Sequence, residues 1–125
     1  MSIKQNKNIY YANLAFEQAK INLGSTGRNP SVGCVILKDD SIISSGHTSL
    51  NGRPHAEFNA LNRDINYKNS SIYISMEPCV HHGVTPPCTN KIIQKKIKNV
   101  FFSVTDLDIR SSNKAKKILE KKKIK

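Results

Sequence analysis

Four residues in the middle of the chain have side chains that can bind a metal ion and activate water beside it. His55 offers an imidazole nitrogen, and Cys79 and Cys88 offer thiolates. Zinc accepts such donors in tetrahedral geometry, and three protein ligands leave a fourth position for water, as in catalytic sites. Glu57 follows His55 by two residues, so in a first helical turn its carboxylate can reach the same point as a general base. These residue types predict a catalytic zinc site.

Each of these residues has a simpler explanation when it is considered alone. A histidine before a helix is commonly a surface residue, and Glu57 in a first turn complements the helix dipole. Cys79 and Cys88 could pair in a disulfide, but three cysteines clustered near histidines do not make a disulfide scaffold. Cys34 lies in an apolar run and is expected in the core, whereas His82 is expected on a loop that faces solvent. The combination of the four residues favours zinc.

Each predicted ligand stands next to a proline at or near an expected helix start. Pro54 precedes His55, and Pro78 precedes Cys79. The stretch "TPPC" (Thr85 to Cys88) is typical of an N-cap followed by prolines in the first turn. The N-terminus of a helix favours negative charge and therefore favours thiolate over thiol. We expect these helix starts to direct the ligands at one ion.

The elements that must position these residues alternate between helices and strands. Apolar residues recur at helical spacing in four segments, and four short runs are apolar and rich in β-branched residues, as strands are. We expect helices at residues 8–23, 55–64, 89–97 and 112–123, and strands at 31–38, 41–46, 70–76 and 99–105. This order predicts one mixed sheet with helices on both faces. The chain stops where a further strand is expected, so the last edge of the sheet is predicted to be unpaired.

Composition restricts the class of protein. A length of 125 residues suits one domain with one core, and no apolar stretch is long enough for a membrane span. The N-terminus lacks the apolar region of a secretory signal, so we expect a cytoplasmic protein without a membrane partner. Most of the net charge of +11 comes from residues 91–125, which carry twelve Lys or Arg and three Asp or Glu. We interpret this segment as a solvated helix face rather than a nucleic-acid patch, because it shows no Arg-rich or aromatic-interleaved pattern.

The order His-x-Glu followed by Pro-Cys matches the signature of zinc deaminases. The stretch "EPCVHHGVTPPCTNKII", with eight residues between its cysteines, resembles the deaminase domain of the bifunctional riboflavin-biosynthesis deaminase/reductase. Residues 29–36, 52–61 and 106–119 resemble other blocks of that domain in the same order. The resemblance implies a three-layer α/β/α cytidine deaminase-like fold with a mixed central sheet and a truncated final strand. It also implies a single zinc-dependent deaminase domain over residues 1–125, with no reductase domain.

The same resemblance implies a reaction and roles for the site residues. The family domain replaces a ring amino group of diaminohydroxyphosphoribosylaminopyrimidine by oxygen in riboflavin biosynthesis and releases ammonia. Glu57 would move a proton from the water to the substrate and the departing ammonia. The residues that would bind Zn2+ are His55, Cys79 and Cys88. The residues that would contact the substrate are Asn29, His81 and Asp106.

Two features depart from the family pattern. The residue before "TPPC" is commonly Lys or Arg, a partner for the substrate phosphate, but here it is Val84. Three explanations stay open. Another residue binds the phosphate, the affinity for the substrate is weak, or the substrate is a different compound. The loop that ends at His55 is one residue longer than the commonest form, so no role is assigned to His47. The candidate substitutes for the missing cation are Arg53, Arg110 and Lys114.

Two other functions stay open on the sequence alone. One is a deaminase of cytosine or adenine in tRNA or single-stranded nucleic acid, which the long loop between the cysteines disfavours. The other is a non-catalytic module stabilised by zinc, which the presence of Glu57 disfavours. The expected partners are a small pyrimidine nucleotide-like substrate and either a second copy of the chain or a reductase domain. Nucleic acid is the less favoured partner.

Overall fold

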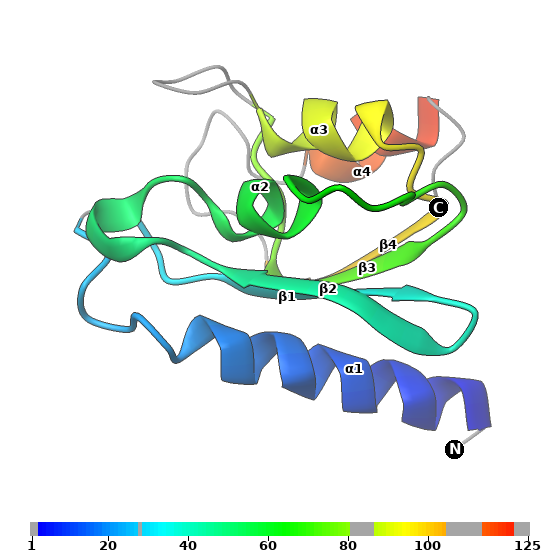
Figure 1. The fold of residues 1–125 in the computed structure, drawn as a ribbon, viewed down its shortest axis with the longest axis horizontal. Helices are drawn as coiled ribbons and strands as arrows, with labels where there is room; N and C mark the ends of the chain where they lie inside the picture. Colours follow the sequence, from blue (N-terminus) through cyan, green and yellow to red (C-terminus); the bar gives the residue numbers. More distant parts are fainter. Residues whose placement is uncertain (1–2, 28, 81–86, 105–113, 122–125) are drawn as a thin grey trace.

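The protein folds into three layers. The computed structural model describes residues 3–27, 29–80, 87–104 and 114–121. The helices are α1 (Ile3–Ala19), the 3-10 turn η1 (Leu50–Gly52), α2 (Ala56–Leu61), α3 (Cys88–Gln94) and α4 (Ala115–Lys121). The strands are β1 (Gly33–Lys38), β2 (Ser41–His47), β3 (Ser71–Met76) and β4 (Asn99–Val104). Figure 1 shows α1 on one face of the sheet and α2, α3 and α4 on the other, which confirms the predicted α/β/α architecture.

The described strands form one mixed sheet in the order β2-β1-β3-β4. Strand β1 pairs antiparallel with β2 and β3, while β3 and β4 run parallel, as expected for a hairpin followed by a strand–helix–strand unit. The hairpin turns at Asp39 and Asp40, whose φ angles of 52° and 64° suit a tight turn that aspartate tolerates. Strand β4 is last in this order, so its outer edge pairs with no described strand.

Alternate residues of the central strands face opposite helix layers. Cys34 and Ile36 belong to the larger core cluster, which lies under α2, α3 and α4. Val35 and Tyr73 pack with Ala15 of α1 in a smaller cluster on the other face. Because both faces are covered, β1 is a nearly continuous apolar run rather than an alternating one. The same run made the strand recognisable in the sequence.

Three helices end before the residues that their patterns predict, and one of them, α3, is predicted to reach residue 97 but ends at Gln94. The helix predicted at residues 8–23 ends at Ala19, and the one predicted at 55–64 ends at Leu61. Carbonyl groups in the last turn of a helix lack partners within it, so they need donors from elsewhere. Side-chain hydroxyl groups from distant residues donate to carbonyls in the final turns of α1 and α2, and they belong to Ser31, Ser44 and Tyr67. Among the described helices, none has the length and apolarity of a membrane-spanning helix.

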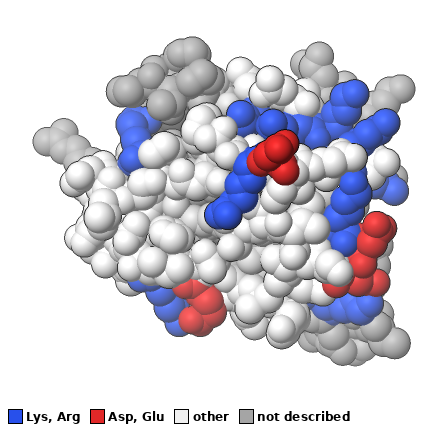
Figure 2. Space-filling model, viewed as in Figure 1, with Lys and Arg blue, Asp and Glu red and all other residues white. Residues whose placement is uncertain are grey.

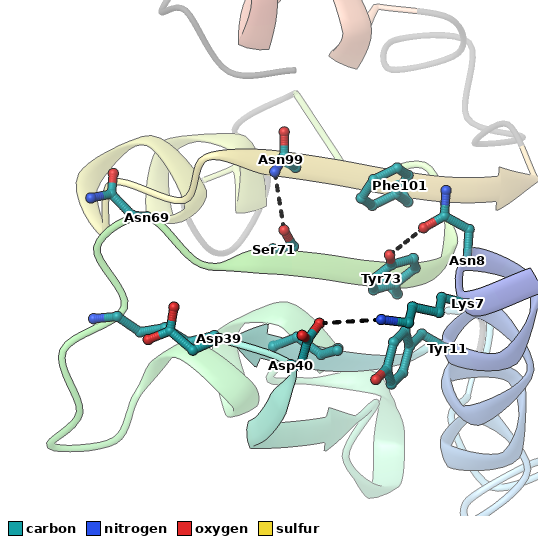
Figure 3. A pocket seen from close by; sticks show the side chains of 12 residues that line it. Lys7, Asn8, Tyr11, Asp39, Asp40, Asn69, Ser71, Tyr73, Asn99 and Phe101 are labelled. Carbon is teal, nitrogen blue, oxygen red and sulfur yellow. Dashed lines mark hydrogen bonds and ion pairs between the residues drawn. The ribbon is translucent and has the colours of Figure 1, made fainter. Parts of the chain in front are cut away.

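An open cavity of about 450 Å³ lies beside α1, on the face of the sheet that this helix covers. Figure 3 shows that its side chains come from α1, from the β1–β2 hairpin and from β3 and β4. The rings of Tyr73 and Phe101 stack there, with 4.5 Å between their centroids. The lining of this cavity includes none of the predicted metal ligands among the described residues, so it is not the candidate active site.

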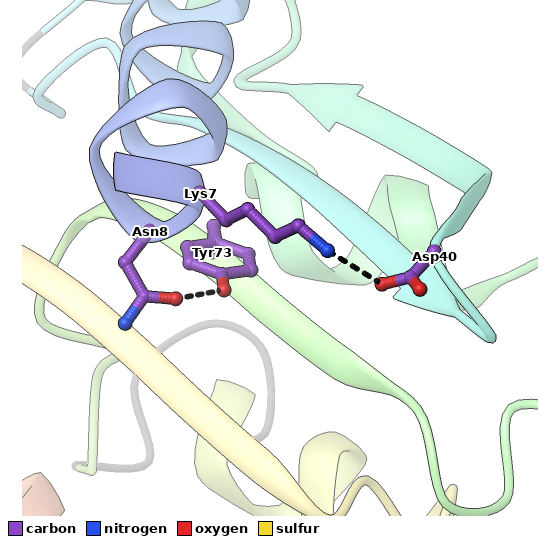
Figure 4. Close-up of polar contacts among 4 residues, drawn as sticks. All are labelled: Lys7, Asn8, Asp40 and Tyr73. Atoms are coloured by element: carbon purple, nitrogen blue, oxygen red, sulfur yellow. Dashed lines mark hydrogen bonds and ion pairs between the residues drawn. The ribbon is translucent and has the colours of Figure 1, made fainter. Parts of the chain in front are cut away.

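Two polar contacts hold α1 beside this cavity. The Tyr73 hydroxyl donates a hydrogen bond to Asn8 Oδ1, and the Lys7 Nζ lies 3.9 Å from Asp40 Oδ1 (Figure 4). The first contact ties α1 to β3, and the second ties it to the hairpin turn. Both lie in the first half of α1, and the Lys7–Asp40 pair is between exposed side chains and contributes little, so the hydrogen bond of Tyr73 to Asn8 is the stronger link.

Helix α2 lies directly on β2 because Gly46 has no side chain. A methyl group at this position would lie 2.5 Å from the Ala56 carbonyl oxygen and 2.8 Å from the Ala60 nitrogen. Such distances are shorter than any van der Waals contact, so only glycine permits this approach of helix and strand. Because α2 carries Glu57, Gly46 helps to set the position of the candidate site above the sheet.

We expect Gly46→Ala to lower the free energy of unfolding by about 1–3 kcal/mol, because the added methyl group forces α2 away from the sheet. Urea denaturation followed by circular dichroism measures the change. The matched control is Ser45→Ala at the neighbouring half-buried position, where we expect a change within about 0.5 kcal/mol. Equal stability of the two variants would show that α2 can shift without cost.

Candidate active site

The structure brings the three predicted metal ligands together on the α2–α3 side of the sheet. The Nδ1 atom of His55 lies 3.5 Å from the Sγ of Cys88 and 3.8 Å from the Sγ of Cys79. All three donor atoms lie within 4.8 Å of one another. Within the described part of the chain, no other group of three such donors is found.

The separations between these donor atoms fit a tetrahedral zinc ion. Bonds of about 2.3 Å to sulfur and about 2.1 Å to nitrogen, at a tetrahedral angle, place nitrogen and sulfur about 3.6 Å apart. The two distances from the His55 nitrogen lie on either side of that value. Two thiolates and one imidazole form a donor set that zinc prefers, and three protein ligands leave room for water. The residues present therefore fit the cofactor that the sequence predicts.

Helix starts hold two of the three donors in place. His55 is the N-cap of α2, and Cys88 is the first residue of α3, with Pro87 as its N-cap. The backbone N–H of Cys88 has no partner within its helix and donates to the Cys79 sulfur at 3.2 Å. Thr85, which the sequence indicates as a cap, lies outside the described residues. The start of α3 therefore fixes the Cys79 sulfur as well as presenting Cys88.

The surroundings of Cys79 favour its thiolate form. A hydrogen bond from the side chain of Cys88, supported by one from His55, lowers the pKa of Cys79 to about 4 although the residue is partly buried. The pKa of Cys88 is raised well above its ordinary value, first by its hydrogen bond with Cys79 and then by burial. Thiolate is the form of cysteine that binds metal ions, and a bound cation would favour this form for both sulfurs.

Glu57 lies in the first turn of α2 and is buried beside the candidate ligands. The residue is 4% exposed, and its carboxyl group interacts with the side chain of Cys88. Burial, and then the negative charge of Cys79, raises the pKa of Glu57 to about 7. A carboxyl group of this kind, next to a metal-binding donor set, can exchange protons with a water molecule and a substrate.

Asn29 supports the loop that leads to His55. Its Nδ2 atom donates to the Gly52 carbonyl at 2.9 Å, and the Thr26 hydroxyl donates to the Asn29 carbonyl at 2.6 Å. Gly52 has a φ angle of +95°, and a Cβ atom there would lie 2.8 Å from Asn29 Nδ2. The two segments thus approach so closely that glycine is required. Asn29 is therefore hydrogen-bonded to the chain at Gly52, three positions before His55.

His47 lines a different cavity from His55 and Cys88. Its Nδ1 atom is 3.4 Å from Gln18 Oε1 of α1. His47 lines a cavity of about 370 Å³ that Asn59 and Arg63 also border, and the described lining of this cavity includes no candidate metal ligand. The described hydrogen bond of the His47 ring is therefore to α1 and not to a candidate ligand.

Sequence reasoning missed two residues that position the site. Glu77 is 3% exposed, and its Oε2 accepts the N–H of Ala115, the first residue of α4, at 3.0 Å. The Asn59 amide donates to the His47 carbonyl at 2.8 Å and so ties α2 to the end of β2. An acidic residue directly between a buried strand and Pro-Cys could have indicated Glu77. Nothing in the local pattern distinguishes Asn59 from an exposed helix residue.

The remaining predicted residues divide by whether the structure describes them. Arg53 is exposed, and its charge acts on His55. A hydrogen bond with Cys79 is the main reason why the pKa of His55 is raised, and the Arg53 charge opposes that rise. Lys114 is exposed immediately before α4. Those outside the described residues are His81, His82, Val84, Asp106 and Arg110.

Known proteins with similar sequences include a pyrimidine deaminase and riboflavin biosynthesis proteins. The family model for the cytidine and deoxycytidylate deaminase zinc-binding region matches residues 5–104. The chain is 42% identical over 119 residues to the diaminohydroxyphosphoribosylamino-pyrimidine deaminase of Buchnera aphidicola, and the match covers 94% of this chain and 81% of that protein. It is 40% identical over 98 residues to riboflavin biosynthesis protein RibD of Escherichia coli, which covers 78% of this chain but 27% of that protein.

Solved structures share the fold. RibD of Acinetobacter baumannii, form 2, superposes with a TM-score of 0.92 at 36% identity, covering 98% of this chain and 35% of that chain. The dCMP deaminase of cyanophage S-TIM5 has a TM-score of 0.72 at 18% identity over all of this chain and 97% of that chain, and this likeness concerns the fold alone. This chain thus spans well under half of each RibD protein. The chain belongs to the family defined by the cytidine and deoxycytidylate deaminase zinc-binding region, and it is a zinc-dependent hydrolytic deaminase of the RibD type.

Proposed function

We propose that the chain deaminates diaminohydroxyphosphoribosylaminopyrimidine as a step of riboflavin biosynthesis. The observation that carries this proposal is the meeting of His55, Cys79 and Cys88 beside the buried Glu57. The 42% identity to a deaminase named for this pyrimidine supports the choice of substrate. In this proposal residues 1–125 act as one deaminase domain. None of the three cysteines forms a disulfide, which is in keeping with the cytoplasmic location that we propose.

The reaction needs an activated water molecule and a proton for the departing ammonia. When bound, zinc lowers the pKa of a coordinated water to near neutrality. The groups proposed to hold the ion are His55 Nδ1 and the two sulfurs of Cys79 and Cys88. Glu57 relays protons from the water to the ring nitrogen and to the departing amino group, so water enters and ammonia leaves. Glu57 is buried in the first turn of α2, so its carboxyl group is little exposed to bulk water.

An ammonia-release assay of zinc-loaded protein tests the proposed function. The substrates are diaminohydroxyphosphoribosylaminopyrimidine and, for comparison, cytidine, dCMP and a single-stranded oligonucleotide. We expect turnover of the first alone. Turnover of another member of this set in its place would make the chain a different deaminase, and no turnover of any would favour a non-catalytic zinc-stabilised module.

We propose that Arg53 binds the phosphate group of the substrate. The family resemblance leads us to expect a cation at the position of Val84, so the phosphate needs another partner. Arg53 lies two residues before His55, is exposed, and acts on the imidazole through its charge. A guanidinium group binds phosphate through two parallel hydrogen bonds, which orients as well as attracts the substrate. Lys114 is the other described candidate, but no interaction with a candidate ligand places it at the site.

Arg53→Gln is expected to raise KM for the phosphorylated substrate by about 10- to 100-fold, because a hydrogen-bonded charge pair contributes about 1.5–3 kcal/mol. We expect kcat to change little, since the phosphate is remote from the reacting ring atom. Steady-state kinetics with the phosphorylated and the dephosphorylated pyrimidine measure this, and KM for the latter should not respond. Lys114→Gln is the matched control. If KM rises for this variant and not for Arg53→Gln, then Lys114 is the residue that binds the phosphate.

A further inference from the structure

A cavity of about 590 Å³ opens between α2 and α3. Its described lining is mainly apolar and includes His55 and Cys88, two of the three candidate metal ligands, together with Pro54 and Pro87. Its volume lies within the range of about 300–1,000 Å³ that is typical of ligand sites. The cavity is therefore part of the candidate active site, and the side chains that line it beyond the metal ligands are placed to contact a bound substrate.

Phe58 and Lys91 line the same cavity within one helical turn of the metal ligands. Phe58 follows His55 by three residues in α2, and Lys91 follows Cys88 by three residues in α3. Residues at this spacing lie on one face of a helix, about 4.5 Å apart along its axis. The two side chains meet, with the Lys91 Nζ 5.0 Å from the ring centroid of Phe58. They form a second pair of contact groups beside the ligand pair.

Lys91 brings a positive charge to this cavity. It is the one Lys, Arg, Asp or Glu residue in the lining that the structure describes. None of the described carboxylates forms an ion pair with its Nζ atom. Lys and Arg side chains also gather along the upper right of the molecule in Figure 2, over α3 and α4, and such a field attracts anions. A mainly apolar cavity with one ammonium group suits a ligand that has an aromatic ring and an anionic group.

We propose that Lys91 binds the phosphate group of the substrate together with Arg53, and that Phe58 holds the lysine in position. This inference rests on the proposed function, because it needs a phosphorylated pyrimidine. The ribosyl group of that compound separates the phosphate from the ring. The phosphate therefore lies away from the metal ligands when the ring is beside them, as Lys91 does.

The charge of a phosphate group favours two cations over one. A phosphate monoester carries about 1.5 to 2 negative charges near pH 7 and has three oxygens that accept hydrogen bonds. One guanidinium group occupies two of these oxygens and balances one charge. Arg53 directly precedes Pro54 of the cavity lining, so its backbone lies at the border of the cavity that Lys91 enters. Lys91 supplies the second charge from the α3 side.

Steady-state kinetics of zinc-loaded Lys91→Gln test this inference. KM for the phosphorylated pyrimidine should rise about tenfold, because one charged hydrogen bond to the phosphate is lost. KM for the dephosphorylated pyrimidine should stay the same, which also shows that the variant is folded. A rise in KM for both compounds would overturn the inference, because Lys91 would then contact the ring or support the cavity.

Lys95→Gln is the matched control. Lys95 is the C-cap of α3, is half-buried like Lys91, and its Nζ lies 5.8 Å from the ring centroid of Tyr67. It does not line the cavity. Its KM values should therefore equal those of the unaltered chain. Equal effects of the two lysine variants would show a response to general charge and would overturn the inference.

Phe58→Leu tests the positioning role of the ring. We expect KM for the phosphorylated pyrimidine to rise about two- to fivefold, because a contact between an ammonium group and a partly exposed ring is weak. In the Lys91→Gln background the same change should have no further effect, since the ring acts through the lysine. An undiminished effect in that background would contradict this role of Phe58.

Isothermal titration calorimetry with ribose 5-phosphate separates this inference from the proposed function, because it needs no turnover. The zinc-loaded chain should bind ribose 5-phosphate more tightly than ribose, and Lys91→Gln should weaken that binding about tenfold. If this is found but the phosphorylated pyrimidine is not deaminated, the proposed function fails and the phosphate site stands. If the pyrimidine is deaminated but Lys91→Gln behaves as the unaltered chain in both assays, the proposed function stands and the inference is overturned.

Discussion

Replacing Glu57 by glutamine is expected to slow deamination by about 10²- to 10⁴-fold while leaving the zinc content unchanged. Glutamine keeps the size of the side chain but cannot accept a proton and return it. The residue is 4% exposed at the start of α2 and is not among the three donor atoms that lie within 4.8 Å of one another. The site should therefore keep its metal and lose its acid–base group. Ammonia release gives kcat, and elemental analysis gives zinc per chain.

The control for this variant is Glu120→Gln, which removes the same charge from an exposed position on α4. We expect its rate and zinc content to match those of the unaltered chain. If Glu57→Gln loses zinc together with its rate, then Glu57 supports metal binding rather than proton transfer. If Glu57→Gln keeps its full rate, the carboxylate has no part in the reaction.

Local sequence predicts most of the chemistry of this site because few residue types can perform it. His55 and Glu57 stand two residues apart after a proline, and Cys79 and Cys88 each follow a proline. The structure confirms helix starts at His55 and Cys88, whereas Cys79 lies in the irregular segment after β3, where the helix start expected from Pro78 is not found among the described residues. Given the two helix starts, the meeting of the donor atoms depended mainly on the order of helices and strands. That order was visible in the sequence because β1 and β3 are buried runs of apolar residues.

Contacts between distant segments could not be predicted in the same way. Helical periodicity describes the faces of one helix, but it does not say which face meets which neighbour. The sequence therefore gave no reason to place Phe58 under Lys91, or to connect Glu77 with the first N–H of α4. The ends of α1 and α2 were predicted too late for a similar reason, since hydroxyl groups from other elements stop these helices.

Replacing either Cys79 or Cys88 by serine is expected to reduce bound zinc to well below one ion per chain and to abolish activity. A hydroxyl group is a much weaker zinc ligand than a thiolate, and each sulfur is one of three donors. A metal that binds only the folded state stabilises it, by about 2.7 kcal/mol when free zinc is a hundred times the dissociation constant. Both variants should lose this zinc-dependent rise in the free energy of unfolding, which denaturation with and without added zinc measures.

Cys34 separates metal binding from the loss of any cysteine. It is fully buried in β1, its Sγ donates to the Ala56 carbonyl at 3.5 Å, and burial raises its pKa well above the ordinary value, so it stays a thiol. Cys34→Ala should bind one zinc ion and keep the zinc-dependent stabilisation, although the cavity it creates lowers the free energy of unfolding by about 1–2 kcal/mol. The proposed ligand set would be contradicted if Cys34→Ala lost its zinc. It would also be contradicted if Cys79→Ser and Cys88→Ser both kept theirs. Glu57 would then stand beside no metal-activated water, and its assigned proton transfer would fail with the ligands.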